Sequence, residues 1–518
     1  MNKKIFVKLL TLALAAVCTS SCDSYLEEYS QDMAKVENWK DLDEVLLGDG
    51  HLESSRIYIQ YSAYQMDIKK NLDILHLMSD ELQENADADY TTLMGWTTGC
   101  YGFHTWQMDT GTDEDGKYKG GDDYYWDLLY QKLNCVNQVI SLIDEQGATS
   151  ATDVEGRNRV KGEAHFLRAA YYFLLVNLYG KPYTAESAKD NLGVPVKLSE
   201  FVEDKEYVRN SVQEVYDQVL ADLEVAEVSL QKTTAPSIYH PDLTATYLLK
   251  SRVYLYMQNW EKAAEYAKKC MDRNSKLLDY ASLNAGDNVL SKNSPETIFS
   301  MGGYAIAFSA LEADNYNFPA YLISDDMMNL YSNDDMRREL YAGKSERHKI
   351  YPVFTKMNGT NSAFGAYSDV SDCFLLRSSE AYLNLAEAAA CKGDLQTAKS
   401  VLNSFLAKRM TVMPTLSDNA NELIQFIRDE RAREFLCEGH RWFDLRRYTV
   451  SSVMPWSKEI IHTHSYYANY EVTRTEYFRL EKNDEAYTLP IPRAVYNFQN
   501  TLQQNRRPDR APFKTDNF

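Results

Sequence analysis

One short stretch concentrates side chains that could carry acid–base chemistry. Residues 430–447 hold three glutamates, an aspartate, a histidine and five arginines. The glutamates recur at every fourth position, which places them on one face of a helix: Glu430, Glu434 and Glu438. Arg431 and Arg441 are positioned to pair with carboxylates along or between helices. This spacing predicts a buried network of ion pairs that fixes helix packing rather than a catalytic centre, and it makes His440 a packing residue.

Aromatic side chains in a segment without helical periodicity offer a different chemistry, the stacking of flat apolar faces on a ligand. Trp and Tyr supply large rigid contact areas at a low entropic cost. The segment from Thr91 to Tyr125 is rich in Gly, Asp, Trp and Tyr. Its densest aromatic group provides three candidate ligand-binding residues: Trp96, Tyr101 and Trp106. The alternative is that some of these rings are buried anchors of the loop, as we expect for Phe103.

The same segment contains an acidic run, Asp113-Glu114-Asp115-Gly116, followed by Asp122 and Asp123. A calcium loop of about 12 residues needs alternating oxygen ligands and a glutamate at its last position, and this run has neither. We therefore expect a solvated loop and no metal site. The cysteines of the mature chain form no CxxC pair, so we also expect no zinc site, no disulfide framework and no cofactor.

Helical hairpins are the elements expected to position these groups. From Leu243 to Met271 and from Leu375 to Leu406, apolar residues recur at helical spacing around a tight turn. Small residues stand twelve positions apart in both segments: Ser251 and Ala263 in the first, Ala386 and Ala398 in the second. Small residues at this separation let the two helices of a hairpin approach closely, which is the tetratricopeptide pattern.

Further helical pairs extend this scaffold, and we expect repeats over residues 126–180, 212–271 and 375–447. The stretches 91–125 and 281–367 lack a regular period and mix apolar residues with turn-forming ones. The predicted fold is therefore mainly α, a tetratricopeptide-like helical-hairpin scaffold with long irregular insertions and a few short strands. Insertions of this kind usually carry binding residues.

The N-terminus has the pattern of an export signal. Lysines precede an unbroken apolar run from Leu9 to Val17, which is too short to span a bilayer. Three small residues and then Cys22 follow this run, a pattern that resembles the lipobox of a bacterial lipoprotein. We expect residues 1–21 to be removed and Cys22 to carry the lipid anchor, because Cys18 follows a valine rather than a small residue. The alternative is an ordinary secreted protein cut near Ser21.

Net charge limits the classes of partner. The chain carries a formal charge of -20, without a cluster of Lys and Arg. Such a chain repels phosphate backbones, which argues against a nucleic-acid partner. Since no later run of about 20 apolar residues follows the signal, we expect no membrane-spanning segment in the mature chain. The length permits one large domain or two to three smaller ones.

Four segments, taken in order, resemble the SusD/RagB family of outer-membrane nutrient-binding lipoproteins. The first is Ser21-Cys22-Asp23-Ser24-Tyr25-Leu26, although an aspartate after the lipidated cysteine is a retention signal in some other bacteria. The second and third run from Ala164 to Pro182 and from Leu376 to Ala388. The fourth and most specific is the charged stretch of residues 430–447. The closing Leu489-Pro490-Ile491-Pro492 is also similar to the family's C-terminal end.

This resemblance implies a single SusD-like domain over residues 22–518. It implies a surface-exposed, lipid-anchored protein of the outer membrane that is not an enzyme. Such proteins bind oligomers, mostly glycans and sometimes peptides, and deliver them to a SusC-like TonB-dependent transporter. In the family, stacking aromatics lie on the loop before the helix that here begins near Trp126 and on the insertion between the middle repeats. The second location implies three more ligand-binding residues: Tyr304, Tyr316 and Phe318.

Three alternatives remain open at this point. Peptide capture by a RagB-like protein would use the same aromatic loops, and an acidic cleft would favour basic peptides. A surface glycoside hydrolase would need two carboxylates about 5 to 9.5 Å apart, and no loop Glu or Asp stands in a recognisable catalytic setting. A pure tetratricopeptide scaffold is disfavoured by the long aromatic insertions.

Overall fold

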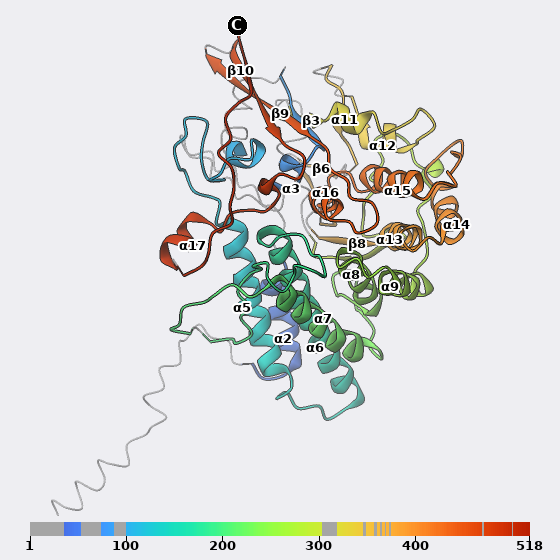
Figure 1. Cartoon of the computed structure of the whole chain (residues 1–518). Coiled ribbons are helices and arrows are strands. Elements are labelled where there is room, and N and C mark those ends of the chain that lie inside the picture. Colours follow the sequence, from blue (N-terminus) through green and yellow to red (C-terminus); the bar gives the residue numbers. More distant parts are fainter. Residues whose placement is uncertain are drawn as a thin grey trace, which may run out of the picture.

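Long helices make up most of this chain, as its computed structural model shows (Figure 1). The structure describes residues 36–52, 74–86, 100–201, 203–302, 319–344, 349–356, 360–362, 365–367, 369–371, 374–468, 471–499 and 501–518. The main helices run in the order α5 (Tyr124–Ile143), α6 (Ala151–Tyr179), α7 (Val212–Leu230), α8 (Leu243–Tyr256), α9 (Trp260–Arg273), α13 (Ser378–Cys391), α14 (Leu395–Leu406), α15 (Ala420–Glu434) and α16 (Arg441–Thr449). Among the described helices, none combines the length and the apolar character needed to cross a bilayer.

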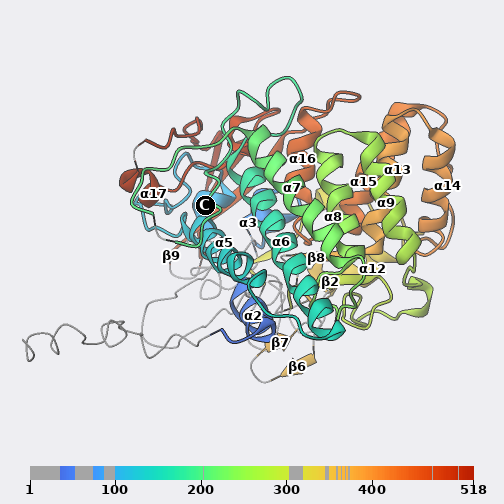
Figure 2. The same ribbon diagram turned by 90° about the horizontal axis from the view of Figure 1, so that it is seen from below.

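Helices that follow one another along the chain pack against each other. Contacts join α5 to α6, α6 to α7, α7 to α8, α8 to α9, α9 to α13 and α13 to α14. Figure 2 shows these helices side by side from α5 at one edge to α14 at the other. The expected fold class, mainly α and tetratricopeptide-like, is therefore confirmed.

The two hairpins explain why small residues recur at their particular spacing. In the α8–α9 hairpin, the Ser251 hydroxyl donates to the Ala263 carbonyl at 2.9 Å, and the Ala263 methyl is fully buried. In the α13–α14 hairpin, Ala386 and Ala398 are fully buried as well. Gly393 adopts a φ of +83° in the intervening turn, where a side chain would be strained. Larger side chains at the buried positions would separate the helices.

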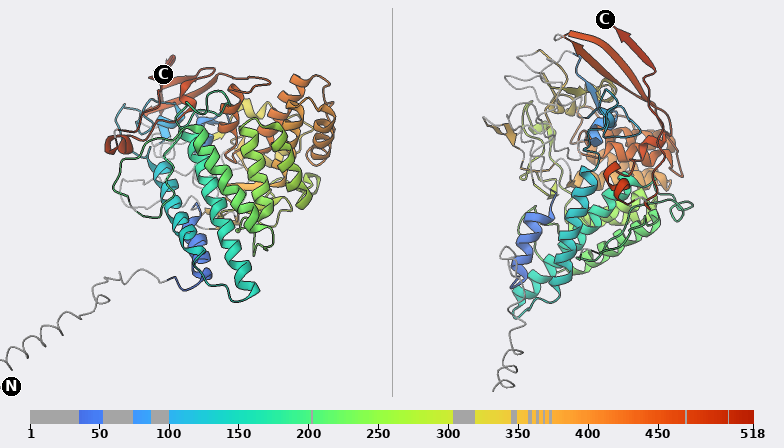
Figure 3. Two further views of the ribbon diagram at one scale, coloured as in Figure 1. Left: turned by 60° about the horizontal axis from the view of Figure 1, so that its bottom comes forward. Right: turned by 90° about the vertical axis from the view of Figure 1, so that its left-hand side faces the viewer.

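Short elements surround the helical scaffold. The longest strands, β9 (Ile460–Ala468) and β10 (Glu471–Leu480), form an antiparallel sheet with β11 (Lys514–Asn517) in the order β11-β10-β9. Figure 3 shows this sheet at one end of the molecule and the turn between α5 and α6 at the other. Two-stranded pairs join β1 (Leu82–Glu84) to β3 (Tyr321–Ile323), β2 (Thr297–Ser300) to β8 (Leu375–Arg377), β4 (Ala342–Gly343) to β5 (Val353–Phe354), and β6 (Thr360–Ser362) to β7 (Gly365–Tyr367). The remaining short helices are α2 (Trp39–Val45), η2 (Leu46–Gly50), α3 (Ile74–Met78), η3 (Tyr280–Ser282), α11 (Asp325–Met328), α12 (Arg337–Tyr341), η4 (Glu485–Tyr487) and α17 (Arg493–Phe498).

The glutamates of α15 form the buried network that their spacing predicts. Glu434 is fully buried and accepts hydrogen bonds from three guanidinium groups: Arg337 at 3.0 Å, Arg377 at 2.5 Å and Arg409 at 2.9 Å. Burial opposes ionisation of this carboxyl, but the arginines outweigh it and hold its pKa well below the usual range. Glu438 pairs with Arg377 and with Lys356, so the network continues past the end of the helix.

The arginines and the histidine of the same stretch also behave as expected. Arg431 pairs with Asp444 at 2.9 Å, and Arg441 pairs with Asp80 at 2.7 Å. His440 is buried, and its ring stacks on Phe435 with centroids 4.3 Å apart. Burial, together with neighbouring arginines, lowers the pKa of His440 well below its ordinary value. This histidine is therefore neutral and serves packing.

Candidate ligand-binding site

Most of the predicted ligand-binding aromatics lie outside the described residues. This applies to Trp96 in the first insertion, to Tyr304, Tyr316 and Phe318 in the second, and to the lipidation candidate Cys22. Their roles stay predictions. The described residues next to both insertions nevertheless show where these segments are anchored.

The two insertions share one anchoring point. Strand β1 pairs antiparallel with β3, with Glu84 opposite Tyr321. Immediately beyond this pair, the Asn85 backbone N–H donates to the Ala320 carbonyl at 2.9 Å, and the Asn85 side-chain amide donates to the Pro319 carbonyl at 2.8 Å. Asn85 precedes the segment that carries Trp96, and Pro319 directly follows the one that carries Phe318. The chain that leads into the first insertion is therefore fixed beside a point within the second one, at the residues that follow Phe318.

Trp106 lies beneath this junction and not on an open surface. Its side chain is fully buried, and its indole N–H donates to the Met78 carbonyl at 2.9 Å. Its ring stacks on His462 of β9, with centroids 4.3 Å apart. The prediction that Trp106 stacks on a ligand is therefore wrong, because both the ring face and the polar edge are already used within the protein.

Tyr101 is also largely enclosed, with only 8% of its surface exposed. Its ring makes edge contacts with His464 at 4.9 Å and with Phe478 at 5.8 Å. Its face is therefore not available as an open platform, which contradicts the prediction for this residue. Phe103 is buried, which confirms its expected role as an anchor. These rings instead fill the space between the first insertion and the C-terminal sheet.

Histidines that sequence analysis did not single out make the base of the junction rigid. His104 stacks on His462 with centroids 4.2 Å apart, and His104 also contacts Tyr321 of β3 at 5.2 Å. The two ring nitrogens of His462 lie 2.7 Å and 2.9 Å from the carbonyl oxygens of His104 and Ser79, and the neutral ring donates its single N–H to one of the two. Burial lowers the pKa of His462 to about 4 and that of His104 well below its usual value. The stack is therefore neutral at ordinary pH.

Glu84 is the most perturbed carboxyl at the junction. One of its oxygens accepts from the Ser465 N–H at 2.9 Å, and the other has no hydrogen-bond partner within the described part of the chain. Burial raises the pKa of Glu84 to about 7. Nearby, the His464 ring bonds the Glu114 carboxylate at 2.7 Å. No local motif could have identified this group, since its members come from three separate segments.

The acidic run is solvent-exposed at Asp115 and Gly116, as its composition predicts, but two carboxylates of the segment are buried and order the loop. Asp113 is buried, and one carboxylate oxygen accepts from the backbone N–H groups of Asp115 at 3.0 Å and Lys117 at 2.8 Å. Asp122 is buried too and accepts from the Tyr118 hydroxyl at 2.8 Å. These carboxylates satisfy backbone and side-chain donors of their own loop, which sequence composition does not reveal.

Comparisons with known proteins agree with this geometry. A family model described as "SusD family" matches residues 340–508, and one described as "Starch-binding associating with outer membrane" matches residues 101–255. The starch-binding protein SusD of Bacteroides thetaiotaomicron is 26% identical over 172 residues, which is 32% of this chain and only 28% of that protein. SusD-like protein P38 of Formosa agariphila is 24% identical over 387 residues, covering 62% of this chain and 71% of its own length.

Solved structures share the fold over almost the whole chain. A putative sugar binding protein from Bacteroides vulgatus superposes with a TM-score of 0.68 at 22% identity, covering 91% of this chain and 99% of its own. A SusD superfamily protein from Bacteroides thetaiotaomicron gives 0.67 at 20% identity, with 91% and 100% covered. The two family models match separate parts of the sequence, and the fold is shared with SusD superfamily structures, so the chain is similar to the SusD-like family in both sequence and fold.

Proposed function

We propose that this protein is a surface-exposed lipoprotein of the outer membrane that binds oligosaccharides and delivers them to a SusC-like TonB-dependent transporter without cleaving them. The observation that supports the proposal most directly is the hydrogen-bonded junction of Asn85 with Pro319 and Ala320, which holds the chain before the first aromatic insertion against a point within the second. The names of its relatives, a starch-binding protein and a putative sugar binding protein, support the ligand class.

The expected platform consists of Trp96 from the first insertion with Tyr304, Tyr316 and Phe318 from the second. A stacking contact of this kind contributes about 0.5–1.5 kcal/mol beyond the burial of area. Association also costs translational and ordering entropy. The expected affinity is therefore in the range of about micromolar to millimolar, and it should rise with oligomer length, because longer ligands cover more rings. A modest affinity also allows the ligand to pass on to a transporter.

Glycan binding is tested on the mature chain with a glycan array and then by calorimetry on the best ligand. Trp96→Ala and Tyr304→Ala should each weaken binding about tenfold. Trp260→Ala serves as a matched control, since Trp260 is a half-buried tryptophan at the start of α9. Wild-type affinity in both loop variants would overturn the assignment of the platform. Release of reducing ends during incubation would instead indicate a hydrolase, and binding confined to basic peptides would indicate peptide capture.

The anchor and the partner need separate tests. Cys22→Ala should leave a soluble exported protein that no longer partitions into the detergent phase. Continued detergent partitioning of this variant would exclude Cys22 as the lipid attachment site. The transporter should co-purify with the wild-type protein from outer membranes, and its identification by mass spectrometry as a protein of another class would refute the proposed partnership.

A further inference from the structure

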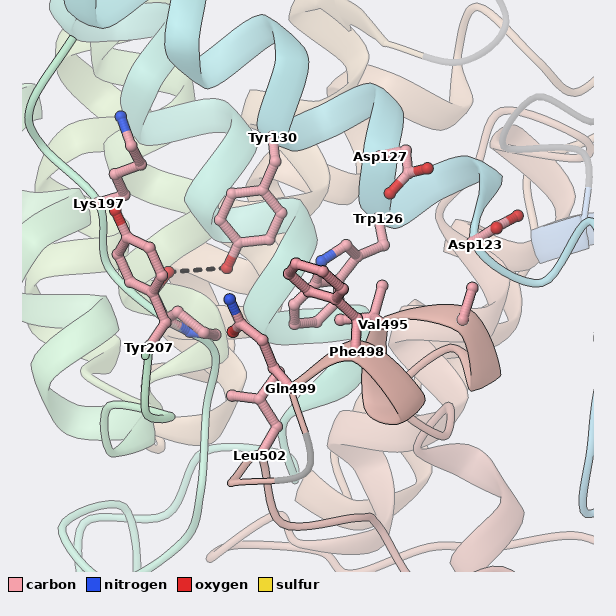
Figure 4. A pocket seen from close by; sticks show the side chains of 12 residues that line it. Asp123, Trp126, Asp127, Tyr130, Lys197, Tyr207, Val495, Phe498, Gln499 and Leu502 are labelled. Atoms are coloured by element: carbon pink, nitrogen blue, oxygen red, sulfur yellow. Dashed lines mark hydrogen bonds between the residues drawn. The ribbon is translucent and has the colours of Figure 1, made fainter. Parts of the chain in front are cut away.

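A separate pocket lies where α5 begins, between that helix, the segment 195–207 and α17 (Figure 4). Its volume is about 310 Å³, and none of its lining residues belongs to the junction described above. Aromatic rings from all three elements form its walls: Trp126, Tyr130, Tyr207 and Phe498. Binding pockets of small molecules combine such apolar walls with a few polar groups.

The walls of the pocket are held in place by contacts behind them. The Trp126 ring packs edge-on against Tyr179, with centroids 5.0 Å apart. The Tyr130 hydroxyl donates to the Pro195 carbonyl at 2.7 Å, and the Tyr207 hydroxyl donates to the Glu203 carboxylate at 2.7 Å. These three rings are therefore oriented before any ligand arrives, which reduces the entropic cost of binding.

Phe498 forms the outer lip of the pocket and is 88% exposed. Its helix, α17, has no buried residue. A phenyl ring at this position contributes little to the core, and its exposed apolar surface is disfavoured in water. If the ring covers a bound molecule, its apolar surface is removed from water, and this burial contributes favourably to the free energy of binding.

Polar groups around the rings have no partner within the described part of the chain. Asp123, the N-cap residue of α5, and Asp127, in its first turn, line the pocket, and neither carboxylate makes a hydrogen bond or an ion pair among the described residues. The same holds for the Gln499 side-chain amide and for the indole N–H of Trp126, a residue only 7% exposed. Figure 4 shows the Gln499 amide between Tyr207 and Phe498, and the carboxylates of Asp127 and Asp123 at the rim of the pocket, on the other side of Trp126. The pocket thus offers both donors and acceptors to a ligand.

We propose that this pocket is a second binding site, specific for a sugar unit that is neutral or carries an amino group. Aromatic rings cover the apolar C–H face of a pyranose, while carboxylates and an amide bond its hydroxyls. The site is distinct from the loop platform and does not depend on it.

Charge in and around the pocket excludes acidic sugars. Burial, with Asp123 and Asp122 close by, raises the pKa of Asp127, so negative charge is already disfavoured at this position. Among the described lining residues, the cation is Lys197, whose ammonium donates to the Ser199 carbonyl, and Figure 4 shows it turned away from the rings. Beside the pocket, the Lys205 ammonium lies 4.9 Å from the centroid of the Tyr207 ring and is neutralised by Glu203 at 2.9 Å. An ammonium group on the ligand would offset the carboxylates, whereas a uronate or a sulfate would be repelled.

Saturation-transfer NMR and calorimetry test this site on a mature variant that lacks the proposed platform, with alanine in place of Trp96, Tyr304, Tyr316 and Phe318. The probes are cellotriose and maltotriose as neutral ligands, the glucosamine trimer as a cationic one and trigalacturonate as an anionic one. The glucosamine trimer or a neutral trimer should still bind, and trigalacturonate should bind at least tenfold more weakly. If none of the neutral or cationic trimers binds, or if trigalacturonate binds as well as they do, the proposal is wrong.

Two variants in the same background locate the site. Phe498→Ala should weaken binding about tenfold, and Asp127→Asn should reduce the preference for the glucosamine trimer over the neutral trimers. Phe518→Ala is the matched control, because Phe518 is another strongly exposed phenylalanine (78%) and does not line the pocket. Thermal unfolding checks that all variants remain folded. Affinity in Phe498→Ala equal to that in the control would overturn the assignment of this pocket.

Discussion

Replacing Glu434 with glutamine tests whether the ion-pair network of α15 determines the stability of the fold. The carboxylate is fully buried and accepts hydrogen bonds from Arg337, Arg377 and Arg409. Glutamine keeps the shape and one acceptor oxygen but removes the charge, so three buried guanidinium groups lose a shared counter-ion. Removing one partner of a buried ion pair costs roughly 3–5 kcal/mol.

The partners that remain reduce this cost. Each guanidinium keeps a second carboxylate: Arg337 keeps Asp335 at 2.8 Å, Arg377 keeps Glu438 at 2.8 Å and Arg409 keeps Glu296 at 2.6 Å. We therefore expect the free energy of unfolding at neutral pH to fall by an amount at the lower end of the range, about 3 kcal/mol.

Urea unfolding followed by far-UV circular dichroism measures this loss as a lower midpoint at an unchanged slope. Glu145→Gln is the control, because Glu145 is exposed and has no ion pair in the described structure, and its effect should stay within about 0.5 kcal/mol. The pKa of Glu434 is depressed in the folded state, so its contribution is present above the unfolded pKa and is lost as the pH falls. The difference between wild type and variant should therefore shrink below about pH 4. A loss under about 1 kcal/mol at neutral pH would refute the reasoning.

Three further predictions concern the junction of the insertions. Burial raises the pKa of Glu84 to about 7 in the folded protein, so the free energy of unfolding of the wild type should fall as the pH rises from about 4.5 to 7. Urea unfolding should show this loss as a fall on the order of 3 kcal/mol between pH 5 and pH 8, and Glu84→Gln should remove it. Gly102→Ala would place a methyl group 2.3 Å from the Thr110 carbonyl oxygen, so it should lower the thermal midpoint, whereas Gly48→Ala, which faces open space, should not. Trp106→Phe loses the hydrogen bond to Met78 and should cost about 1–3 kcal/mol in unfolding free energy. Its glycan affinity by calorimetry should match the wild type, since the ring is buried, and a clear loss in a folded variant would contradict the revised role of Trp106.

The helical part of the fold could be predicted from sequence because its determinants are local. For example, the twelve-residue spacing of Ser251 and Ala263 indicates a close contact between the two helices of a single hairpin, and the structure shows a hydrogen bond between these two residues. The four-residue spacing of the glutamates in α15 likewise places their charges on one face before any tertiary contact is known. Even so, the identity of the arginines that reach Glu434 from α12 and β8 could not be read from that segment.

The candidate site was less predictable, because long-range contacts determine which aromatic rings face solvent. Trp106 lies in a segment with the composition of a binding loop, and it is buried by contacts with other segments, among them Met78 and His462. Trp126 is a core residue, as its position near the start of a helix indicates. The sequence does not show that segments far along the chain leave a pocket against it. In both cases the decisive information lies in the packing of residues that are remote in sequence.

The hydrogen bonds of Asn85 to Pro319 and Ala320 have an evolutionary consequence. These bonds lie at the boundary between the helical scaffold, which determines the fold, and the segments proposed to determine which ligand binds. Helices α6 to α9 and α13 to α16 lie outside both insertions, whereas Glu296, Arg337 and Lys356 of the ion-pair network lie inside the second one. Selection can therefore change the length and composition of the insertions without altering the scaffold only where these three residues are kept. Since Asn85 ties the chain before the first insertion to a point within the second, a change in either insertion alters the surroundings of both. We therefore expect that a new ligand specificity evolves through substitutions that occur together in both insertions.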